Sequence, residues 1–327
     1  MKNNVLLILL LLATAAKAQT LPLKLWYDRP AQYFEESLPI GNGKMGALVY
    51  GGADVNTIYL NDITLWTGEP VDINEDAGAH KWIPEIRKAL FNEDYALADS
   101  LQLHVQGHNS RFYQPLLTMN IEDNDAMYDH NLDKTVTDYY RELDINNAIC
   151  RDRYTRRGVT YEREYFASNP DKVIAIRLKA NVKGMLNVKV SLTGQVPHHS
   201  KASDNQVTVI GHATGDELHS IHFCSILKAL SDEGVIHASD STITISGATT
   251  ATLFFVNETS YSGSDKHPVS QGADYLANAA DDAWHLVNFS YDALRNRHIS
   301  DYVELFGRFR LRLGKPVFDN KRPTNQQ

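Results

Sequence analysis

Hydrophobic and polar positions alternate along most of this chain, from Leu21 to about Ser264. Alternation or a run of β-branched residues covers 173–178, 188–193, 207–210, 242–246 and 252–256. Clusters of Gly, Asn, Asp and Ser separate these runs, at 181–184, 203–205, 211–215 and 231–234. Successive side chains of a strand point to opposite faces, so a period of two indicates half-buried strands. Many short strands at this spacing predict a mainly β fold, a large antiparallel β-sandwich rather than βαβ units.

Two segments have helical spacing instead. Pro84–Leu101 places apolar residues three and four apart, with Pro84 suited to a first helical turn, and we expect it to be an insertion between strands. The second segment, Asp274–Phe306, has a restart at Ser290. A brief strand-like run and a polar tail come after it. The sequence thus predicts a sandwich over 19–270, a helical linker over 271–310 and the start of a further segment over 311–327.

The helical linker carries apolar side chains for which the sequence shows no partner. Leu276, Leu286, Leu294 and Phe306 recur along its helices. We expect these four to form a stripe without cover inside this chain, which would favour association with other protein surfaces.

The first eighteen residues are typical of a secretory signal peptide. Lys2 is followed by the apolar run Val5–Leu12 and by Ala16-Lys17-Ala18, which predicts cleavage after Ala18. The apolar run is too short to span a bilayer, and no cysteine follows it for a lipid anchor. We therefore expect an exported protein, periplasmic or extracellular, with no membrane anchor.

Charge and cysteine content exclude several classes of protein. Lys and Arg number 32 against 40 Asp and Glu, and removal of Lys2 and Lys17 makes the mature balance 30 − 40 = −10. An acidic chain without a basic cluster is not expected to bind nucleic acid. Two cysteines cannot form a disulfide scaffold or a multi-cysteine metal site. Cys150 and Cys224 lie in strand-like surroundings, which favours buried thiols but leaves a disulfide between them open.

Several short motifs match known functional patterns, but the flanking sequence does not supply the structure that each pattern requires. Gly41-Asn-Gly-Lys-Met-Gly46 is followed by a strand pattern rather than a helix, so it indicates a turn and not a nucleotide site. The Asp72–Asp76 segment lacks the glycine and the glutamate of a calcium-binding loop. The acidic cluster at 123–129 likewise gives no specific indication of a calcium site. A spacing of three puts His219 and His222 on opposite faces of a strand. His298 lies on an apolar helix face, so we expect structural histidines and no metal site.

Carboxylates near aromatic residues are the remaining candidates for chemistry. Paired carboxylates are the usual machinery of glycosidases. Such residues occur near the N-terminus, at Glu35, Glu36, Asp62 and Glu69, with Trp26 and Trp66 near them. The sequence assigns no distance to any pair, so it identifies no catalytic pair.

An ordered series of longer motifs carries a family resemblance. The motifs are LWYDRPA (25–31), LPIGNGKMGA (38–47), LNDITLWTG (60–68), IPEIRKAL (83–90), YQPL (113–116), YRELDINNAICRDRYTRRGVTYEREYFASNPDKVIAIRL (140–178), HISDY (298–302) and LF (305–306). Together they closely resemble the N-terminal part of glycoside hydrolase family 95, the α-L-fucosidases and some α-L-galactosidases. The resemblance covers residues 21–318. The chain departs from it at Leu117-Thr-Met119, where the family has a glycine-containing step, and in the acidic region 122–138.

The resemblance implies a β-supersandwich followed by a helical linker. Family members are much longer, and their catalytic residues lie in a later (α/α)6 barrel, which has no counterpart here. The complete enzymes would hydrolyse terminal α-L-fucosyl linkages with inversion, without a metal or organic cofactor. No catalytic residue can therefore be carried over to this chain, which is expected to be inactive alone.

Three interpretations stay open. In the first, the chain is the N-terminal part of a fucosidase-like enzyme, with a fucosylated glycan as substrate and a separately encoded barrel as a partner. In the second, it is a non-catalytic carbohydrate-binding or pseudoenzyme module, in which Trp26 and Trp66 stack on sugars. In the third, it is a free-standing hydrolase. Under the first, Asn61, Trp66 and Glu69 are predicted to lie near substrate or at the barrel interface. The alternative for these residues is that Asn61 caps a turn and Trp66 packs between domains.

Overall fold

The computed structural model describes residues 23–71, 74, 76–106, 111–124, 132–311 and 322–326. The predicted signal peptide and its cleavage site at Ala18 lie outside the described residues. So do parts of the Asp72–Asp76 segment, of the acidic cluster at 123–129 and of the 311–327 tail.

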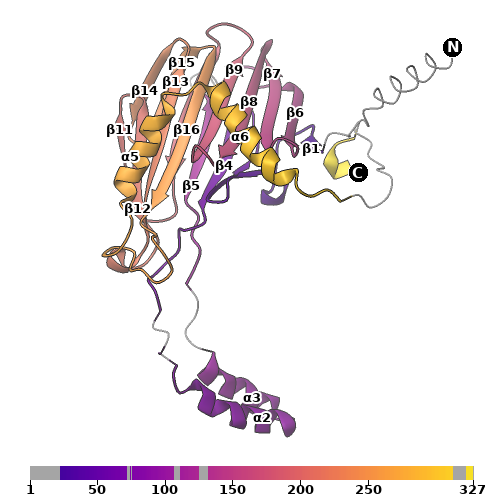
Figure 1. Ribbon diagram of the computed structural model, residues 1–327. Helices are drawn as coiled ribbons and strands as arrows, with labels where there is room; N and C mark the ends of the chain where they lie inside the picture. Colours follow the sequence, from indigo (N-terminus) through magenta and orange to yellow (C-terminus); the bar gives the residue numbers. More distant parts are fainter. Residues whose placement is uncertain are drawn as a thin grey trace, which may run out of the picture.

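The described chain forms two antiparallel sheets that face each other, as the sequence predicted (Figure 1). The nine-stranded sheet has the order β1 (Lys24–Tyr27), β6 (Thr137–Asp144), β7 (Ile149–Arg156), β8 (Val159–Ser168), β9 (Val173–Ala180), β16 (Thr250–Thr259), β13 (His222–Ser231), β12 (Gln206–His212) and β11 (His198–Ser203). The seven-stranded sheet has the order β14 (Val235–Ser239), β15 (Thr242–Ala248), β10 (Leu186–Thr193), β5 (Leu117–Asp123), β4 (Val55–Asp62), β3 (Met45–Val49) and β2 (Leu38–Gly41).

The main core lies between the two sheets, where the alternating pattern directs its apolar side chains. In β4, Ile58 and Leu60 are buried in this core, while Thr57 and Tyr59 point outward. The glycine motif at 41–46 makes the turn between β2 and β3, and Gly43 has a φ of 91° that favours glycine. The prediction of a turn leading into a strand is confirmed.

A polar network is also buried between the sheets. The Asp152 carboxylate accepts hydrogen bonds from Arg163 Nε (2.6 Å) and from the Tyr165 hydroxyl (2.7 Å). That hydroxyl accepts in turn from Asn56 Nδ2 at 2.9 Å. Asp152 and Arg163 are almost fully buried, so each charge depends on the other to offset its desolvation.

Two helices, α5 (Tyr275–Leu286) and α6 (Tyr291–Phe306), cover the outer face of the nine-stranded sheet (Figure 1). They begin at the side-chain caps Asp274 and Ser290, so the restart predicted at Ser290 is confirmed. A second core lies beneath them. Val173 and Ala175 of β9 face this core, whereas the intervening Ile174 faces the first. Because both faces of this strand are covered here, its apolar side chains no longer alternate with polar ones.

The uncovered apolar stripe predicted for the linker is therefore half wrong. Leu286 and Leu294 are buried against the sheet, with 3% and 0% of their surface exposed. Leu276 and Phe306 are exposed, at 44% and 39%. The error arose because the outer face of a sheet can accept helices whenever its own outward residues are apolar, as they are along these central strands.

Polar contacts fix α6 to the sheet. Glu164 of β8 accepts hydrogen bonds from Tyr291 Oη (3.0 Å) and Arg295 Nε (2.8 Å) of the helix, and from Arg151 Nε (2.8 Å) of β7. Burial alone would raise the pKa of Glu164, but these arginine contacts hold it below its usual value.

His298 is a structural residue, as predicted. It is buried, stacks on Phe166 at 5.0 Å, and its Nε2 donates to the Ala148 carbonyl at 3.0 Å. Burial lowers the pKa of His298, which favours the neutral ring.

The predicted helical insertion lies between β4 and β5, but it forms two helices instead of one. α2 (Ile83–Phe91) and α3 (Tyr95–Gln102) pack against each other, and short 3₁₀ turns flank them at Ala79–Trp82 and Leu103–Val105. The break occurs because Glu93 has a φ of 60° and the Asp94 side chain caps the second helix through the Leu97 N–H. Figure 1 shows this helical hairpin set apart from the sandwich.

The two cysteines cannot form a disulfide in this fold. Cys150 lies on β7 and faces the main core, whereas Cys224 lies on β13 and faces the second core. Three strands separate them in the sheet, and neighbouring strands are about 4.8 Å apart, far beyond the reach of a disulfide. Within the described ranges, no helix has both the length and the apolar character that crossing a bilayer requires.

Candidate functional site

The site is built where β4 ends and the chain leaves the sandwich toward the helical hairpin. The buried Asp62 carboxylate accepts from the Thr64 backbone N–H (2.9 Å) and from Asn257 Nδ2 (2.9 Å). These bonds hold a tight turn at the end of the strand. Beyond it, backbone hydrogen bonds join Leu65 to Gln114 and Thr67 to Phe112. The outgoing and returning segments therefore form a short ribbon, which fixes the position of the side chains along it.

Trp66 and Asn61 meet on this ribbon through Tyr113. Trp66 contacts the Tyr113 ring edge-on, with centroids 6.1 Å apart, and its Nε1 donates to the Ile63 carbonyl at 2.9 Å. The Tyr113 hydroxyl donates a short hydrogen bond to the Asn61 side chain. Trp66 and Tyr113 are both more than two-fifths exposed, so they offer aromatic surface to a ligand.

Glu69 lies a few residues further along, beside different partners. Gly68 has a φ of 75°, which favours glycine, and a Cβ there would stand 2.6 Å from Arg111 Nε, so the arginine side chain packs directly against this turn. Glu69 Oε2 is 3.0 Å from His267 Nε2. The His267 Nδ1 accepts from the backbone N–H groups of Val269 and Ser270 at 3.2 Å each. His267 Nε2 therefore carries the proton and donates it to Glu69.

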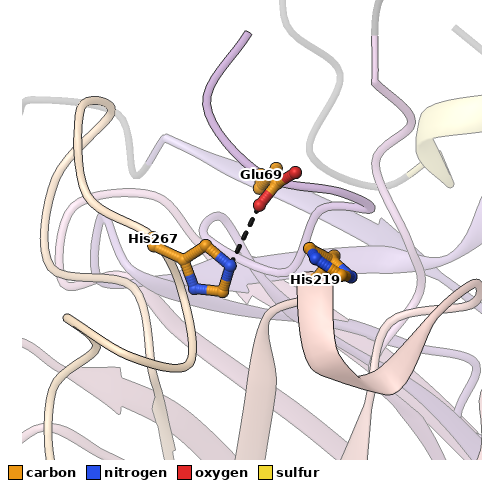
Figure 2. Close-up of side chains that lie close together, drawn as sticks. All are labelled: Glu69, His219 and His267. Atoms are coloured by element: carbon orange, nitrogen blue, oxygen red, sulfur yellow. Dashed lines mark ion pairs between the residues drawn. The ribbon is translucent and has the colours of Figure 1, made fainter.

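His219 completes the cluster from a third segment. It ends the short 3₁₀ helix Glu217–His219, and its Nδ1 is 2.8 Å from Asp216 Oδ2. The Leu218 N–H and the His219 side chain lower the pKa of Asp216, so this carboxyl stays ionised near neutral pH. The His219 and His267 ring centroids are 5.5 Å apart. Figure 2 shows Glu69, His219 and His267 close together on separate parts of the chain.

Two hollows open on this cluster, which we call the Glu69 site (Glu69, Arg111, His219 and His267). One, of about 280 Å³, is lined by Thr67, Gly68, Glu69, Arg111, Thr214, Gly215, Asp216, His219 and Ser220. The other, of about 300 Å³, adds Trp66, Tyr261, Lys266 and Pro268 around Glu69 and Arg111. Carboxylate, guanidinium and imidazole groups beside an aromatic ring can bind the hydroxyls and the apolar face of a sugar.

The structure brings together only some of the residues singled out from sequence. Asn61 and Trp66 share Tyr113, while Glu69 belongs to the neighbouring histidine cluster. Their proximity to substrate stays a prediction. Asp62 and Glu36 are structural, because Asp62 holds the turn and Glu36 pairs with Arg29.

Trp26 is less available for stacking than predicted. Its ring packs against Tyr140 at 5.6 Å, and its indole N–H is buried.

Four residues at or beside the site were not predicted from sequence: Arg111, Tyr113, Asp216 and His267. Tyr113 was visible only as part of a family motif. Glu69, His219 and His267 are too far apart in sequence for any spacing rule, and only the meeting of three loops unites them. His219 lies in a 3₁₀ turn before β13, which begins at His222, so the prediction that the two histidines occupy opposite faces of one strand does not apply.

Comparison with known proteins agrees with this architecture. Residues 25–264 match the family model described as glycosyl hydrolase family 65, N-terminal domain. The chain is 30% identical to Alpha-L-fucosidase 2 of Arabidopsis thaliana over 89% of its own length and 37% of that protein. It is 25% identical to a probable alpha-fucosidase A of Aspergillus niger over 92% of its length and 39% of that protein. The chain thus spans less than two-fifths of these relatives.

The fold also resembles a solved structure. A putative kojibiose phosphorylase from human microbiome superposes with a TM-score of 0.50 at 10% identity, over 86% of this chain and 39% of that one. This likeness concerns the fold alone. The family match extends over well more than half of the residues, and it agrees with the two-sheet sandwich. The chain belongs to the glycosyl hydrolase family 65 N-terminal domain family.

Proposed function

We propose that this chain is the N-terminal part of an exported α-L-fucosidase-like glycoside hydrolase of the family 95 type, and that it is inactive alone. The observation that carries the proposal is the match to fucosidases over nine-tenths of this chain but less than two-fifths of theirs. In the complete enzyme, inverting hydrolysis of a terminal α-L-fucosyl linkage would use an acid and a base from the catalytic barrel.

Asp216, beside the Glu69 site, and Glu69 itself are better suited to binding than to the role of the glycosidase acid. A glycosidase acid must be protonated at working pH, whereas the pKa of Asp216 is lowered. Glu69 accepts a hydrogen bond from His267 Nε2, and its carboxylate oxygens can also accept hydrogen bonds from sugar hydroxyls. We infer that Glu69, with Trp66 and Asn61 nearby, contacts the glycan where the sandwich meets the barrel.

Exposed apolar side chains support the presence of a further protein surface. On the helical hairpin, Phe91 is 87% exposed, and Leu90, Tyr95 and Leu103 are also open. On α6, Leu305 is exposed at 59%. Apolar surface of this extent is typical of an interface. A barrel, encoded on the same or on a separate chain, is the partner we propose for it.

The decisive experiment measures activity of the mature chain, Gln19–Gln327, on an aryl α-L-fucoside and on 2′-fucosyllactose. It is run with the chain alone and with a barrel fragment expressed separately. We expect turnover only in the mixture. Turnover by the chain alone would refute the proposal, because it would place an acid and a base within these residues. Export is tested separately by N-terminal sequencing of secreted protein, which should begin at Gln19.

A carbohydrate-binding module without catalysis is the second candidate, and one observation favours it. The outer face of the seven-stranded sheet carries a groove of about 670 Å³ that includes Phe34, Tyr50 and Tyr59. The Tyr59 ring lies 6.2 Å from Phe34 and 5.5 Å from Tyr50. This candidate would be favoured if the chain bound glycans, if Tyr59→Ala abolished that binding, and if no hydrolysis were seen either with the chain alone or with the added barrel fragment.

A further inference from the structure

We propose that Glu69, His219 and His267 bind one divalent transition-metal ion, preferentially Zn²⁺, as a structural clip. One potential ligand atom from each residue lies within 4.8 Å of the other two. Tetrahedral zinc sites hold nitrogen and oxygen ligands at about 2.0–2.2 Å, which sets these atoms somewhat more than 3 Å apart. The His267–Glu69 pair is already at 3.0 Å, so His219 has the larger adjustment to make.

The donor set selects the class of ion. Two imidazoles and one carboxylate suit Zn²⁺ and neighbouring first-row ions, whereas Ca²⁺ and Mg²⁺ prefer sets composed of oxygen atoms. Three protein ligands leave a fourth position for water. The hollow of about 280 Å³ beside Glu69 and His219 has room for that water.

Asp216 prepares His219 for this role. Its carboxylate accepts a hydrogen bond from the Nδ1–H of His219, with Nδ1 and Oδ2 2.8 Å apart, and this leaves the Nε2 lone pair free. A carboxylate that orients a ligating histidine from its second nitrogen is the usual arrangement at zinc sites. Asp216 is itself held, because it caps the 3₁₀ turn through the Leu218 N–H at 3.0 Å.

His267 must change tautomer to bind the ion. In the structure its Nδ1 accepts from the Val269 and Ser270 N–H groups, so Nε2 carries the proton. Coordination through Nε2 moves that proton to Nδ1, which removes both contacts and would point the Nδ1–H at two backbone donors, so the ring must also turn away from them. Each contact is long, at 3.2 Å, and the two share one lone pair, so the ring gives up weak bonds. Together with the nearby Arg111 charge, this cost leads us to expect micromolar affinity.

The ligands come from three segments that are distant in sequence. Glu69 lies at the root of the helical insertion, His219 before β13, and His267 in the loop after β16. An ion held by all three would join the root of the insertion to two loops of the sandwich. A clip that closes long loops restricts the unfolded chain and should stabilise the fold. This inference does not depend on the proposed hydrolysis, which requires no metal, but it uses the Glu69 carboxylate that the proposed function places beside the glycan, so a bound ion would occupy one of its oxygens.

The test uses the chain Gln19–Gln327 without a polyhistidine tag, stripped of metal by EDTA and returned to a buffer free of chelator. Titration calorimetry with ZnCl₂ should give one ion per chain. Addition of Co²⁺ should produce the visible absorption of a tetrahedral site. The imidazole ¹⁵N spectrum should show His267 changing from the Nε2–H to the Nδ1–H tautomer on Zn²⁺ binding.

Variants separate this site from adventitious binding. Glu69→Gln and His219→Ala should each weaken Zn²⁺ binding at least about tenfold, and Asp216→Asn by roughly tenfold or more, as is usual for a carboxylate behind a ligating histidine. His237→Ala, at an exposed position of β14, is the matched control and should bind like the native chain. Thermal unfolding of each variant without metal verifies the fold. Binding unchanged in Glu69→Gln and His219→Ala, or no stoichiometric binding by the native chain, would overturn the proposal.

Discussion

Removal of one buried leucine from α6 tests whether the linker helices are an integral part of the sandwich. Leu294 has no exposed surface and packs in the second core, between the helix and the nine-stranded sheet. Leu305 lies on the same helix and is 59% exposed. Leu294→Ala and Leu305→Ala make the same chemical change in the same helix, and alanine favours a helix at least as well as leucine, so a larger loss at Leu294 reports packing.

The expected magnitude is set by burial. Leu→Ala removes about three methylene equivalents, which is about 2.4 kcal/mol of transfer free energy at about 0.8 kcal/mol each. The cavity adds to this, so Leu294→Ala should lower the free energy of unfolding by about 3 kcal/mol. Leu305→Ala should stay within about 0.5 kcal/mol of the native chain. For a domain of this size, about 3 kcal/mol corresponds to a Tm lower by roughly 6–12 °C.

Urea unfolding followed by tryptophan fluorescence measures both variants, and Trp284 on α5 places a reporter on the linker. Coincident transitions by fluorescence and by circular dichroism would show that the chain unfolds in one cooperative step. If Leu294→Ala were no more destabilising than Leu305→Ala, the helices would not be docked as the structure has them. The stripe predicted from sequence would then be uncovered after all.

Three further predictions concern the buried polar groups. Asp152→Ala should lower the free energy of unfolding in urea by about 3–5 kcal/mol, because it leaves a buried arginine charge unpaired. The pKa of Glu164 is lower in the folded than in the unfolded chain, where it lies near 4.5, so its contribution to stability is complete above that pH and is lost as the pH falls toward the folded pKa. Glu164→Gln should therefore lose less stability than the native chain between about pH 5 and pH 3 in matched urea titrations. Burial raises the pKa of Cys224 to about 11 and that of Cys150 well above its usual value, so neither thiol should react with a disulfide reagent until the chain is unfolded, when both should. If only one of the two thiols reacted after unfolding, or if mass spectrometry found a disulfide-linked peptide, the conclusion that both thiols are free and buried would be contradicted.

The sequence alone was sufficient for the fold class, for the strands over the five alternating or β-branched runs and for the restart of the linker at Ser290. The pattern at 188–193, which lies in β10, and the restart at Ser290 are local signals, because the backbone geometry of a strand or a helix end depends on residues a few positions away. The turn at Gly43 was predictable for the same reason. Where the local pattern was ambiguous, the prediction failed: nothing in the periodicity of 84–101 required the break that Glu93 and Asp94 introduce.

Contacts between segments distant in sequence could be known only from the folded chain. The docking of Leu286 and Leu294 depends on the outer face of strands that lie much earlier in the chain, and the separation of Cys150 from Cys224 depends on strand order. The Glu69 site depends on three loops that meet at one end of the sandwich. No periodicity records such a meeting, because the side chains involved share no element and their proximity results from the path of the whole chain.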